Sequence, residues 1–453
     1  MATLSPIRSE QIDAGAAAIL QTLHEAGHQA LLAGGCVRDL LLGKRPTDWD
    51  IASDAEPPRV RELFPRTYAI GERFGIIRVV TELGEYEVAR FRREGSYSDG
   101  RHPDIVEFTD AEEDARRRDL TINALFYDPI AGEVVDFVDG RYDLVAQIVR
   151  AVGDPETRLR DDRLRVLRTI RFAARLDWQI ETATWKAACA LAPSADTVSA
   201  ERVHEELTRI LTEGGAATGA QLLMDSGLMA VLLPEVAALE GVPQPPEYHP
   251  EGDVWVHVKR MLFELDRATE ATPELAWAVL LHDVGKPGTF SESDRIRFNG
   301  HDARGAEMVD AIGYRLRMSN ARRERIRELT AQHMRFRNVR QMRESKLKRF
   351  LRSPLFPELL ELHRIDCVGS HGALDLYEFC RDRLETMADD PEGLVPPRLL
   401  SGVDLIEMGY ATGPRFRRML NWVEDAQLEG RIHSFEEARA EIQKHFPDEG
   451  ERG

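Results

Sequence analysis

Two patterns of hydrophobic and polar positions divide the chain near residue 154. Before this point, short apolar stretches, several of them alternating with polar residues, predict β-strands. These stretches are HQALLAGG (28–35), DWDIAS (48–53), GIIRVVTE (75–82) and EYEVARFR (85–92). Residues 11–27 have an amphipathic helical pattern that ends at Gly27, and VRDLLLG predicts a helix that stops at Gly43. Mixed strands and helices with short connections predict an α+β domain.

Beyond residue 154 the strand pattern fades, and apolar positions recur with helical spacing almost to the end of the chain. The stretch DDRLRVLRTIRFAARL (161–176) predicts one helix, and residues 199–212 predict another with Ser199 as the N-cap. Residues 241–253, GVPQPPEYHPEGD, are rich in proline and glycine and predict a linker or an ordered loop. A second helical block follows and carries most of the histidines.

The length of 453 residues suggests roughly three domains, and the patterns predict four regions. They are an α+β head (1–153), an all-α neck (154–240), a helical domain rich in histidine (246–380) and a helical C-terminal region (381–453).

Charge and cysteine usage narrow the class of protein. With 60 basic and 78 acidic residues the net charge is −18, which argues against a non-specific nucleic-acid binder. Arginines are nevertheless concentrated at 115–119, 158–175 and 335–352, so a basic cleft on an acidic body is compatible with the sequence. The four cysteines are scattered, so we expect reduced thiols rather than disulfides or a zinc site.

The sequence gives no indication of a membrane protein. No apolar run is long enough to span a bilayer, and the N-terminus has neither the basic nor the apolar region of a secretory signal. We therefore expect a cytoplasmic protein with no membrane partner. The sequence does not predict the oligomeric state.

The first candidate site combines a glycine pair with two aspartates. Gly34 and Gly35 stand at a predicted strand-to-helix turn, where backbone N–H groups can approach a phosphate. Arg38 lies in the first turn of that helix. Asp48 and Asp50, two residues apart on a predicted strand, project to the same side and can hold Mg²⁺. Each feature alone is common in turns and on surfaces, but their order and spacing favour nucleotidyl transfer assisted by two metal ions.

The pattern G-G-x-V-R-D-x-L-L-G…D-x-D-I-A resembles that of the tRNA nucleotidyltransferase and poly(A) polymerase family, in its bacterial and eukaryotic class, class II, which includes the CCA-adding enzymes. Four further segments resemble motifs of this family in the same order, at 117–125, 136–155, 161–172 and 201–207. The resemblance implies a polymerase-β-like nucleotidyltransferase head, followed by an all-α neck that selects the nucleotide.

The resemblance also implies roles for individual residues of the head. Asp48 and Asp50 would ligate Mg²⁺, and Glu87 is a candidate third carboxylate, although a solvent-facing glutamate fits the same pattern. The residues that would contact the nucleotide and its triphosphate are Gly34, Gly35, Arg38 and Arg118. Residues 91–108 resemble the flexible loop between the first two motifs of the family.

The nucleotide-selecting motif lies at residues 161–172. By resemblance, Asp162 and Arg165 would face the Watson–Crick edge of CTP or ATP, and Arg168 and Arg171 would face the triphosphate. Asp162, Arg165 and Arg168 are spaced i, i+3, i+6, which predicts that they share one face of the helix. An acceptor beside a fixed donor fork can reject UTP and GTP, because the wrong base edge leaves buried groups unpaired. Taken alone, this helix also fits a salt-bridged surface stripe.

The second candidate site is a set of six histidines and aspartates in the second helical block. They are His257, His282, Asp283, His301, His333 and Asp366. Mixed nitrogen and oxygen donors are typical of a metal site, and the order H…HD…H…H…D resembles two-metal members of the HD superfamily of metal phosphohydrolases. Histidine-rich ligation suits Mn²⁺, Ni²⁺, Co²⁺ or Fe²⁺ better than Mg²⁺. The resemblance implies phosphodiesterase or phosphatase activity, for example on a tRNA end that bears a 2′,3′-cyclic phosphate, and the alternative is a degenerate HD fold kept as a scaffold.

Together the two sites predict a template-independent enzyme that builds or repairs the 3′-terminal CCA of tRNA from CTP and ATP, with an additional HD phosphohydrolase activity. The neck and the helical C-terminal half would bind the acceptor arm and 3′ end of the tRNA. CC-adding enzymes, A-adding enzymes and poly(A) polymerases share these motifs and remain alternatives. From another class, the chain fits an HD phosphohydrolase whose head is a vestigial RNA-binding module.

Overall fold

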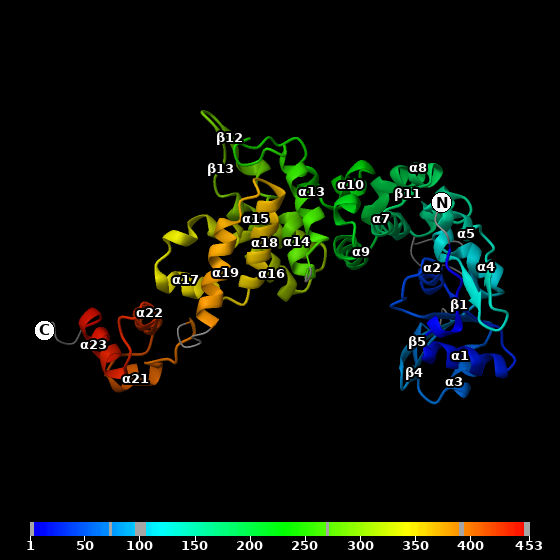
Figure 1. Cartoon of the computed structure of the whole chain (residues 1–453), viewed down its shortest axis with the longest axis horizontal. Helices are drawn as coiled ribbons and strands as arrows, with labels where there is room; N and C mark the ends of the chain where they lie inside the picture. Colours follow the sequence, from blue (N-terminus) through cyan, green and yellow to red (C-terminus); the bar gives the residue numbers. More distant parts are fainter. Residues whose placement is uncertain (1–3, 72–74, 96–105, 269–270, 389–393, 448–453) are drawn as a thin grey trace. The chain divides into compact units, whose positions relative to one another are not determined.

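The structure is a computed structural model that describes residues 4–71, 75–95, 106–268, 271–388 and 394–447 (Figure 1). The chain divides into two compact units. The first comprises the chain up to Ala238 together with Ile312–Met318 and a short segment that ends at Pro273. The second comprises Leu239–Ala268, Glu274–Ala311 and the chain from Ser319 onward.

A mixed β-sheet forms the centre of the head. Within the described ranges it has seven strands in the order β3-β4-β5-β2-β1-β8-β9. The strands are β1 (Ala30–Ala33), β2 (Asp50–Ser53), β3 (Thr67–Gly71), β4 (Ile76–Thr81), β5 (Gly84–Arg90), β8 (Phe126–Asp128) and β9 (Glu133–Val135). Strands β2 and β5 pair in parallel, with Asp50 opposite Glu87, and the other neighbours are antiparallel. The predicted α+β head is confirmed.

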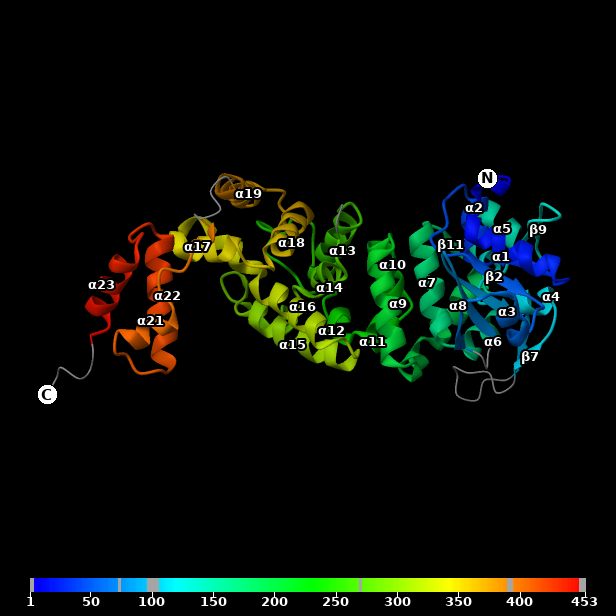
Figure 2. The ribbon, with the colours of Figure 1, turned by 90° about the horizontal axis from the view of Figure 1, so that it is seen from below.

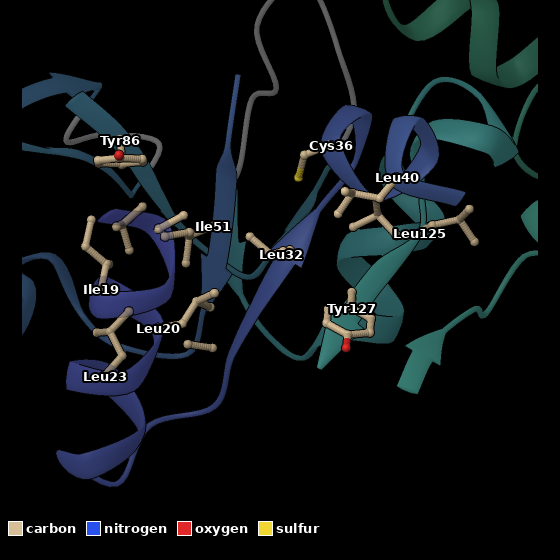
Figure 3. Close-up of a cluster of buried hydrophobic side chains, with 14 of the residues drawn as sticks. Ile19, Leu20, Leu23, Leu32, Cys36, Leu40, Ile51, Tyr86, Leu125 and Tyr127 are labelled. Atoms are coloured by element: carbon tan, nitrogen blue, oxygen red, sulfur yellow. The ribbon is translucent and has the colours of Figure 1, made fainter. Parts of the chain in front are cut away.

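Strand β1 is buried along its whole length. Leu32 belongs to the core cluster that β1 shares with Ile51 and with helix α1 (Ala14–Glu25) (Figure 3). Leu31 belongs to a second cluster, which includes Phe126. Because successive strand side chains point to opposite faces, the run ALLA serves two cores at once. This double burial explains why the strand has no polar alternation, and each buried leucine contributes about 2 kcal/mol relative to exposure.

The neck is helical, and helices α7, α9 and α10 pack against one another (Figure 2). Besides α1, the α-helices described up to Ala238 are α2 (Gly35–Leu41), α3 (Pro57–Leu63), α4 (Ala111–Arg117), α5 (Gly140–Ala146), α6 (Pro155–Asp161), α7 (Leu164–Leu176), α8 (Thr182–Leu191), α9 (Ala200–Thr212), α10 (Ala216–Asp225), α11 (Leu228–Leu232) and α12 (Pro234–Ala237). Ser199 is the N-cap of α9 as expected, although its hydroxyl does not cap the helix amides. Phe172 on α7 is part of the head core, so the neck begins as an extension of the head.

The helix expected over residues 161–176 is interrupted. Helix α6 ends at Asp161 and α7 begins at Leu164. Asp162 has an extended backbone with φ −137°, and its Oδ1 accepts a hydrogen bond from the backbone N–H of Leu164 at 3.1 Å. Aspartate side chains compete with helical hydrogen bonds in this way. The prediction of one helix, with Asp162 on the same helical face as Arg165, was therefore wrong.

Asp48 lies before strand β2, not within it. The strand begins at Asp50, because its partner β1 ends at Ala33, where Gly34 turns the chain into α2. Residues before Asp50 thus have no partner strand on that side. The expectation that Asp48 and Asp50 share one strand face was wrong, although both line the same cavity, as described below.

Three other sequence predictions can be compared with the structure: the loop at 91–108, the free cysteines and the lack of a membrane-spanning helix. The loop expected at 91–108 is described only at its ends, where β6 (Arg92–Glu94) pairs with β7 (Val106–Phe108), and residues 96–105 lie outside the described residues. The four cysteines are free thiols, as expected. In the part of the chain that the structure describes, no helix is long and apolar enough to cross a membrane.

The second unit is largely helical. Its longer helices are α13 (Val254–Leu265), α14 (Pro273–Leu281), α15 (His301–Arg315), which continues into the first unit, α16 (Asn320–Gln332), α17 (Glu344–Leu351), α18 (Phe356–Gly369), α19 (Asp375–Ala388), α21 (Gly402–Glu407), α22 (Pro414–Leu428) and α23 (Phe435–His445). A short hairpin of β12 (Phe290–Glu292) and β13 (Ile296–Phe298) precedes α15. The last three helices have a core cluster of their own, which includes Leu405, Met419 and Ile442.

Candidate active sites

A cavity of about 780 Å³ lies between the sheet of the head and helix α7. This volume is typical of a site for a small ligand, which ranges over about 300–1,000 Å³. The transferase residues predicted from the sequence all line it: Gly34, Gly35, Arg38, Asp48, Asp50, Glu87, Arg118, Asp162, Arg165, Arg168 and Arg171. Predicted residues up to 137 positions apart in sequence, from Gly34 to Arg171, are thereby brought to one site.

Three carboxylates form one wall of this cavity. Asp50 and Glu87 are neighbours on the parallel strands β2 and β5, and Asp48 stands in the loop before β2. Burial raises the pKa of Asp50; Arg118 opposes this shift, and the charges of Glu87 and Asp48 add to it. Glu87 also accepts a hydrogen bond from Arg78 at 2.9 Å. Such concentrated negative charge is the environment in which a divalent cation is most stabilising.

Residue 34 in the turn after β1 is a glycine that lies close to the side chain of Arg118. Gly34 has φ +73°, and a Cβ at this position would lie 2.8 Å from Nη1 of Arg118. Arg118 itself donates to the backbone carbonyl of Asn123 at 3.1 Å and to Asp114 at 3.1 Å. The turn therefore lets the Arg118 guanidinium pass against the backbone next to the carboxylates. Any side chain at residue 34 would displace it.

Arg38 lines the cavity, but its side chain is almost completely buried. Its Nε donates to Asp39 at 2.9 Å, its Nη1 donates to Asn123 Oδ1 at 2.5 Å, and its guanidinium lies 5.0 Å from the ring centre of Phe172. These contacts fix its orientation at the base of the cavity. The resemblance implied a direct phosphate contact, and the geometry shows an arginine already held by three partners.

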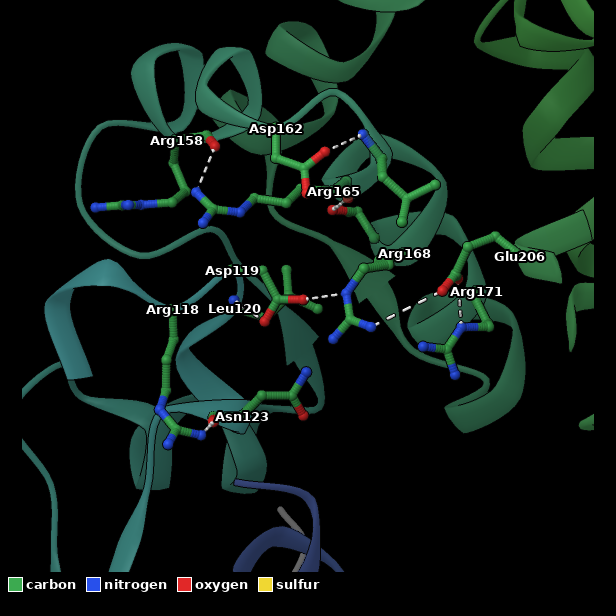
Figure 4. Close-up of polar contacts among 12 residues, drawn as sticks. Arg118, Asp119, Leu120, Asn123, Arg158, Asp162, Arg165, Arg168, Arg171 and Glu206 are labelled. Atoms are coloured by element: carbon green, nitrogen blue, oxygen red, sulfur yellow. Dashed lines mark hydrogen bonds and ion pairs between the residues drawn. The ribbon is translucent and has the colours of Figure 1, made fainter. Parts of the chain in front are cut away.

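The two residues expected to read the base already have protein partners (Figure 4). Arg165 donates to the backbone carbonyls of Arg158 at 3.0 Å and Arg117 at 3.2 Å. Asp162 accepts two hydrogen bonds from Arg202, at 2.6 and 3.2 Å. Both side chains are therefore held in fixed orientations, as a site that discriminates by hydrogen bonding requires.

The two arginines expected to face the triphosphate are held by acidic residues (Figure 4). Arg168 donates to Asp119 at 2.6 Å, and Arg171 donates to Glu206 and Glu213, both at 2.7 Å. Burial opposes ionisation of Asp119, but Arg168 lowers the pKa of this carboxyl well below its usual range. Because a guanidinium carries five N–H donors, an arginine held by one or two carboxylates can still donate to a phosphate.

Sequence reasoning missed Asp119, Arg202 and Glu206. Asp119 lies within the motif at 117–125, and the other two lie within the motif at 201–207, so the segments were identified but not these side chains. Arg202 and Glu206 are four residues apart on α9, which places them on the same face of that helix. The spacing of four residues was the signal in the sequence from which Arg202 and Glu206 could have been predicted to face the same site.

The six residues predicted for the HD site come together in the second unit. Ligand atoms of His257, His282 and Asp366 lie within 4.8 Å of one another, and so do those of Asp283, His301 and His333. Gly285 makes the assembly possible, since a Cβ there would lie 2.2 Å from the carbonyl oxygen of His301 at the start of α15. These groups can hold metal ions. In contrast, no such group of three within 4.8 Å occurs at Asp48, Asp50 and Glu87.

Three histidines of the HD site are oriented by backbone carbonyls. The Nδ1 atoms of His282, His301 and His333 lie 3.0, 2.8 and 2.6 Å from the carbonyls of the residues three positions earlier. A carbonyl can only accept, so each ring in its neutral form carries the proton on Nδ1 and leaves Nε2 able to accept a hydrogen bond or to bind a metal ion. Nε2 of His301 then lies 3.2 Å from Nε2 of His333. Two facing lone pairs repel unless a cation lies near them, so this arrangement fits a bound metal ion.

His257 stands between two carboxylates. Its side chain is 0% exposed, with Nε2 at 3.1 Å from Asp366 and Nδ1 at 2.9 Å from Glu251. Burial lowers the pKa of His257, but Asp366 and Glu251 outweigh burial and raise it to about 9. His333 shows the opposite balance, since burial and the charge of His282 lower its pKa to about 4. Glu251 and its neighbour His249 were not predicted, because they lie in the proline-rich segment read as a linker or loop.

Known protein families match successive parts of the chain. The Poly A polymerase head domain matches residues 30–150, the probable RNA- and SrmB-binding site of polymerase A matches 177–239, and the HD domain matches 254–367. Fold and sites therefore define a class of proteins in which a nucleotidyltransferase head and a helical neck are joined to an HD domain.

Curated relatives narrow this class. The multifunctional CCA protein of Pseudomonas paraeruginosa is 35% identical over 365 residues, which cover 76% of this chain and 85% of the relative. The CCA-adding enzyme of Ligilactobacillus salivarius is 41% identical over 211 residues, 46% of this chain and 52% of the relative. The chain belongs to the tRNA nucleotidyltransferase and poly(A) polymerase family that includes these proteins. It spans about half the length of several of the CCA-adding enzymes that it matches.

Solved structures share the fold. The Bacillus stearothermophilus CCA-adding enzyme, in complex with CTP, is 24% identical with a TM-score of 0.71, and the match covers 94% of this chain and 96% of that one. The Thermotoga maritima CCA-adding enzyme, complexed with tRNA, is 18% identical with a TM-score of 0.60 and covers 98% and 99%. The expected polymerase-β-like head with an all-α neck, HD domain and helical C-terminal region is confirmed as a fold.

Proposed function

We propose that the chain is a tRNA nucleotidyltransferase that adds or repairs the 3′-terminal CCA, using CTP and ATP and releasing pyrophosphate. One observation carries the proposal: a single cavity joins three carboxylates of the head to the Asp162 and Arg165 pair of the neck. The names of the relatives support it, as do the complexes of related enzymes with CTP, ATP and tRNA.

In the proposed reaction, the 3′-hydroxyl oxygen of the tRNA forms a bond to the α-phosphorus while the bond from this phosphorus to the β-phosphate oxygen breaks. Asp48, Asp50 and Glu87 would hold Mg²⁺, which when bound activates the attacking hydroxyl and stabilises the charge on the leaving pyrophosphate. The protein's own cations act on the same charge. Arg118 lines the cavity close enough to Asp50 to oppose the rise in its pKa, and Arg168 and Arg171 line the cavity from α7.

Selection of the base would fall to Asp162 and Arg165. Each is held by partners within the protein, Arg202 for Asp162 and two backbone carbonyls for Arg165, so neither has to be ordered when the nucleotide binds. A rigid acceptor and donor pair gains specificity because a mismatched base leaves both groups unpaired. CC-adding, A-adding and poly(A)-adding enzymes use the same class of site and stay open as alternatives.

The test is incorporation of labelled nucleotides into tRNA lacking CCA, tRNA lacking only the terminal A, and a random RNA 3′ end. The proposal expects CTP and ATP to be added in order to the first, ATP to the second, and nothing to the third. Addition of C alone, of A alone, or of many A residues would support one of the narrower alternatives. No incorporation at all would overturn the transferase proposal.

A second activity is favoured by the convergence of the six HD ligands. We propose that they hold Mn²⁺, Ni²⁺, Co²⁺ or Fe²⁺ and that the site hydrolyses a phosphate ester, such as a 2′,3′-cyclic phosphate at a tRNA end. The facing Nε2 atoms of His301 and His333 support a cation there. Hydrolysis of 2′,3′-cyclic AMP with each metal tests the idea, and no hydrolysis with any of them would favour a scaffold role. The cytoplasmic location expected from the sequence stays a prediction.

A further inference from the structure

The proline-rich segment at 241–253 is a closed loop that covers part of the HD site. The backbone N–H of Val254 donates to Val242 at 3.0 Å, and that of Gly241 donates to Asp253 Oδ2 at 2.7 Å. Asp253 also caps helix α13 by accepting from Val256 at 2.8 Å. These bonds join the two ends of the segment at the start of α13. The segment is therefore an ordered loop, the second of the two alternatives that its composition predicted.

The loop places three polar side chains next to the predicted metal ligands. Gln244 is buried and accepts a hydrogen bond from Nζ of Lys286 at 2.6 Å, and the same Nζ lies 2.6 Å from Asp283. The side chain of Glu251 is 0% exposed, and His249 is half-buried beside it. A linker would have no reason to bury such groups, because burial of a polar or charged side chain costs free energy unless it is paired.

Glu251 lies on the side of His257 away from the other ligands. Its Oε1 is 2.9 Å from Nδ1 of His257, whereas Nε2 of the same ring faces Asp366. Oε1 also accepts a hydrogen bond from Nδ1 of His249 at 2.8 Å. His249, Glu251 and His257 thus form a row in which one carboxylate oxygen joins two imidazoles. His257 and His282 continue the row, with ring centres 5.5 Å apart.

We propose that Glu251 is a positioning residue for the HD metal site and that His249 holds Glu251 in place. A carboxylate close to Nδ1 of an imidazole favours the tautomer with the proton on that nitrogen, orients the ring and makes the opposite nitrogen a better metal ligand. For His257 the opposite nitrogen is Nε2, which lies with His282 and Asp366 in one ligand group. The proposal rests on the proposed HD metal site and adds to it residues outside the H…HD…H…H…D set.

The test measures metal binding by the full chain rather than its activity. Mn²⁺ affinity is obtained by isothermal titration calorimetry, and the visible absorption spectrum of bound Co²⁺ reports the ligand geometry. Substitution Glu251→Ala is expected to weaken Mn²⁺ binding by about 10- to 100-fold and to shift the Co²⁺ bands. Glu251→Gln keeps an uncharged oxygen close to Nδ1 of His257, so a smaller loss of Mn²⁺ affinity is expected. His249→Phe removes the residue that holds Glu251 and should also weaken Mn²⁺ binding.

Glu247→Ala is the matched control, because Glu247 is exposed in the same loop and should leave both readouts unchanged. A purely structural role for Glu251 would lower the temperature of unfolding but leave the Co²⁺ spectrum of the loaded protein unaltered. If Glu251→Ala does not fold, the Mn²⁺ affinity and the Co²⁺ spectrum of Glu251→Gln are used to test the proposal instead. Wild-type affinity and spectrum in a folded Glu251 variant would overturn this proposal alone, whereas a wild-type chain that binds no metal would overturn the HD metal site itself.

Discussion

The head cavity and the HD site both suit phosphate chemistry, but they are prepared to different degrees. In the HD site, histidine and aspartate ligand atoms converge to within 4.8 Å in two groups, with ring orientations set by backbone carbonyls. In the head, three carboxylates line a wide cavity without converging, and the arginines opposite them are held by acidic partners. The ligand atoms of the HD site are close enough together to share metal ions as they stand. The three head carboxylates are not, and a bound nucleotide triphosphate would supply further oxygen ligands there.

This difference follows from the chemistry of the ions. Mg²⁺ in nucleotidyl transfer usually takes only a few ligands from the protein and the rest from water and substrate phosphates. Transition metals prefer nitrogen-rich sites whose ligands are oriented by further hydrogen bonds. We therefore expect metal to remain on the HD site of the free protein and Mg²⁺ to bind the head tightly only together with CTP or ATP.

The largest expected effect comes from removing the head carboxylates. Asp48→Ala combined with Asp50→Ala should lower nucleotide incorporation by at least about a thousandfold, because several kcal/mol of transition-state stabilisation are lost and each 1.4 kcal/mol is tenfold. Mn²⁺ binding at the HD site should be unchanged. Loss of both properties in a folded variant would show that the two sites are not independent.

The converse substitution tests the same independence from the other side. His282→Ala combined with Asp283→Ala removes one ligand from each of the two HD groups, so metal binding and phosphate-ester hydrolysis should fall below detection. Incorporation of CTP and ATP should stay at the wild-type level. If incorporation of CTP and ATP also fell in the folded variant, the head site and the HD site would not be independent.

A smaller effect is expected at Arg202, which holds Asp162. Without Arg202 the carboxylate can turn away from the base, and a hydrogen bond to a charged group contributes about 1.5–3 kcal/mol. Arg202→Ala should therefore reduce the preference for CTP and ATP over UTP and GTP by roughly tenfold or more. Misincorporation by single-nucleotide assays measures this ratio. Arg160→Ala serves as the control, because Arg160 is exposed and pairs only with Glu156 among the contacts described for it.

The smallest effect concerns pH and the metal-free HD site. Burial disfavours the charged form of His257, but Asp366 and Glu251 raise its pKa to about 9, above the unfolded value near 6.5. Its contribution to stability is therefore fully present below pH 6.5 and is lost as the pH rises through about 9. Hydrogen exchange of α13 in chelator-treated protein should become faster over this range. His257→Gln should abolish this dependence, and an unchanged profile in that variant would assign it to another group.

Much of the fold and of both sites could be predicted because the signals are local. Gly34, Gly35 and Asp50 were identified from one short stretch, and the structure then places the candidate Glu87 opposite Asp50. The six HD residues were identified by their type and order, and the structure brings them together. Strand β1 was predicted from its short apolar run, and the structure shows it buried along its whole length.

The remaining features depend on contacts that the local pattern does not contain. Arg202 meets Asp162 across 40 positions, and nothing in either segment alone identifies the pair. At the break between α6 and α7, the backbone N–H of Leu164 donates a hydrogen bond to the side chain of Asp162, and helical periodicity cannot reveal such a contact. Glu251 was hidden because a segment rich in proline and glycine has no periodicity from which a buried position can be read.

The most direct test of the central claim, that one chain has two separate sites for phosphate chemistry, is a single assay on both double variants. Labelled CTP and ATP are supplied with tRNA lacking CCA, and 2′,3′-cyclic AMP hydrolysis is followed in parallel with added Mn²⁺ or Ni²⁺. The account predicts that Asp48→Ala/Asp50→Ala loses only nucleotide addition and that His282→Ala/Asp283→Ala loses only hydrolysis. Loss of both activities in either folded variant would contradict it.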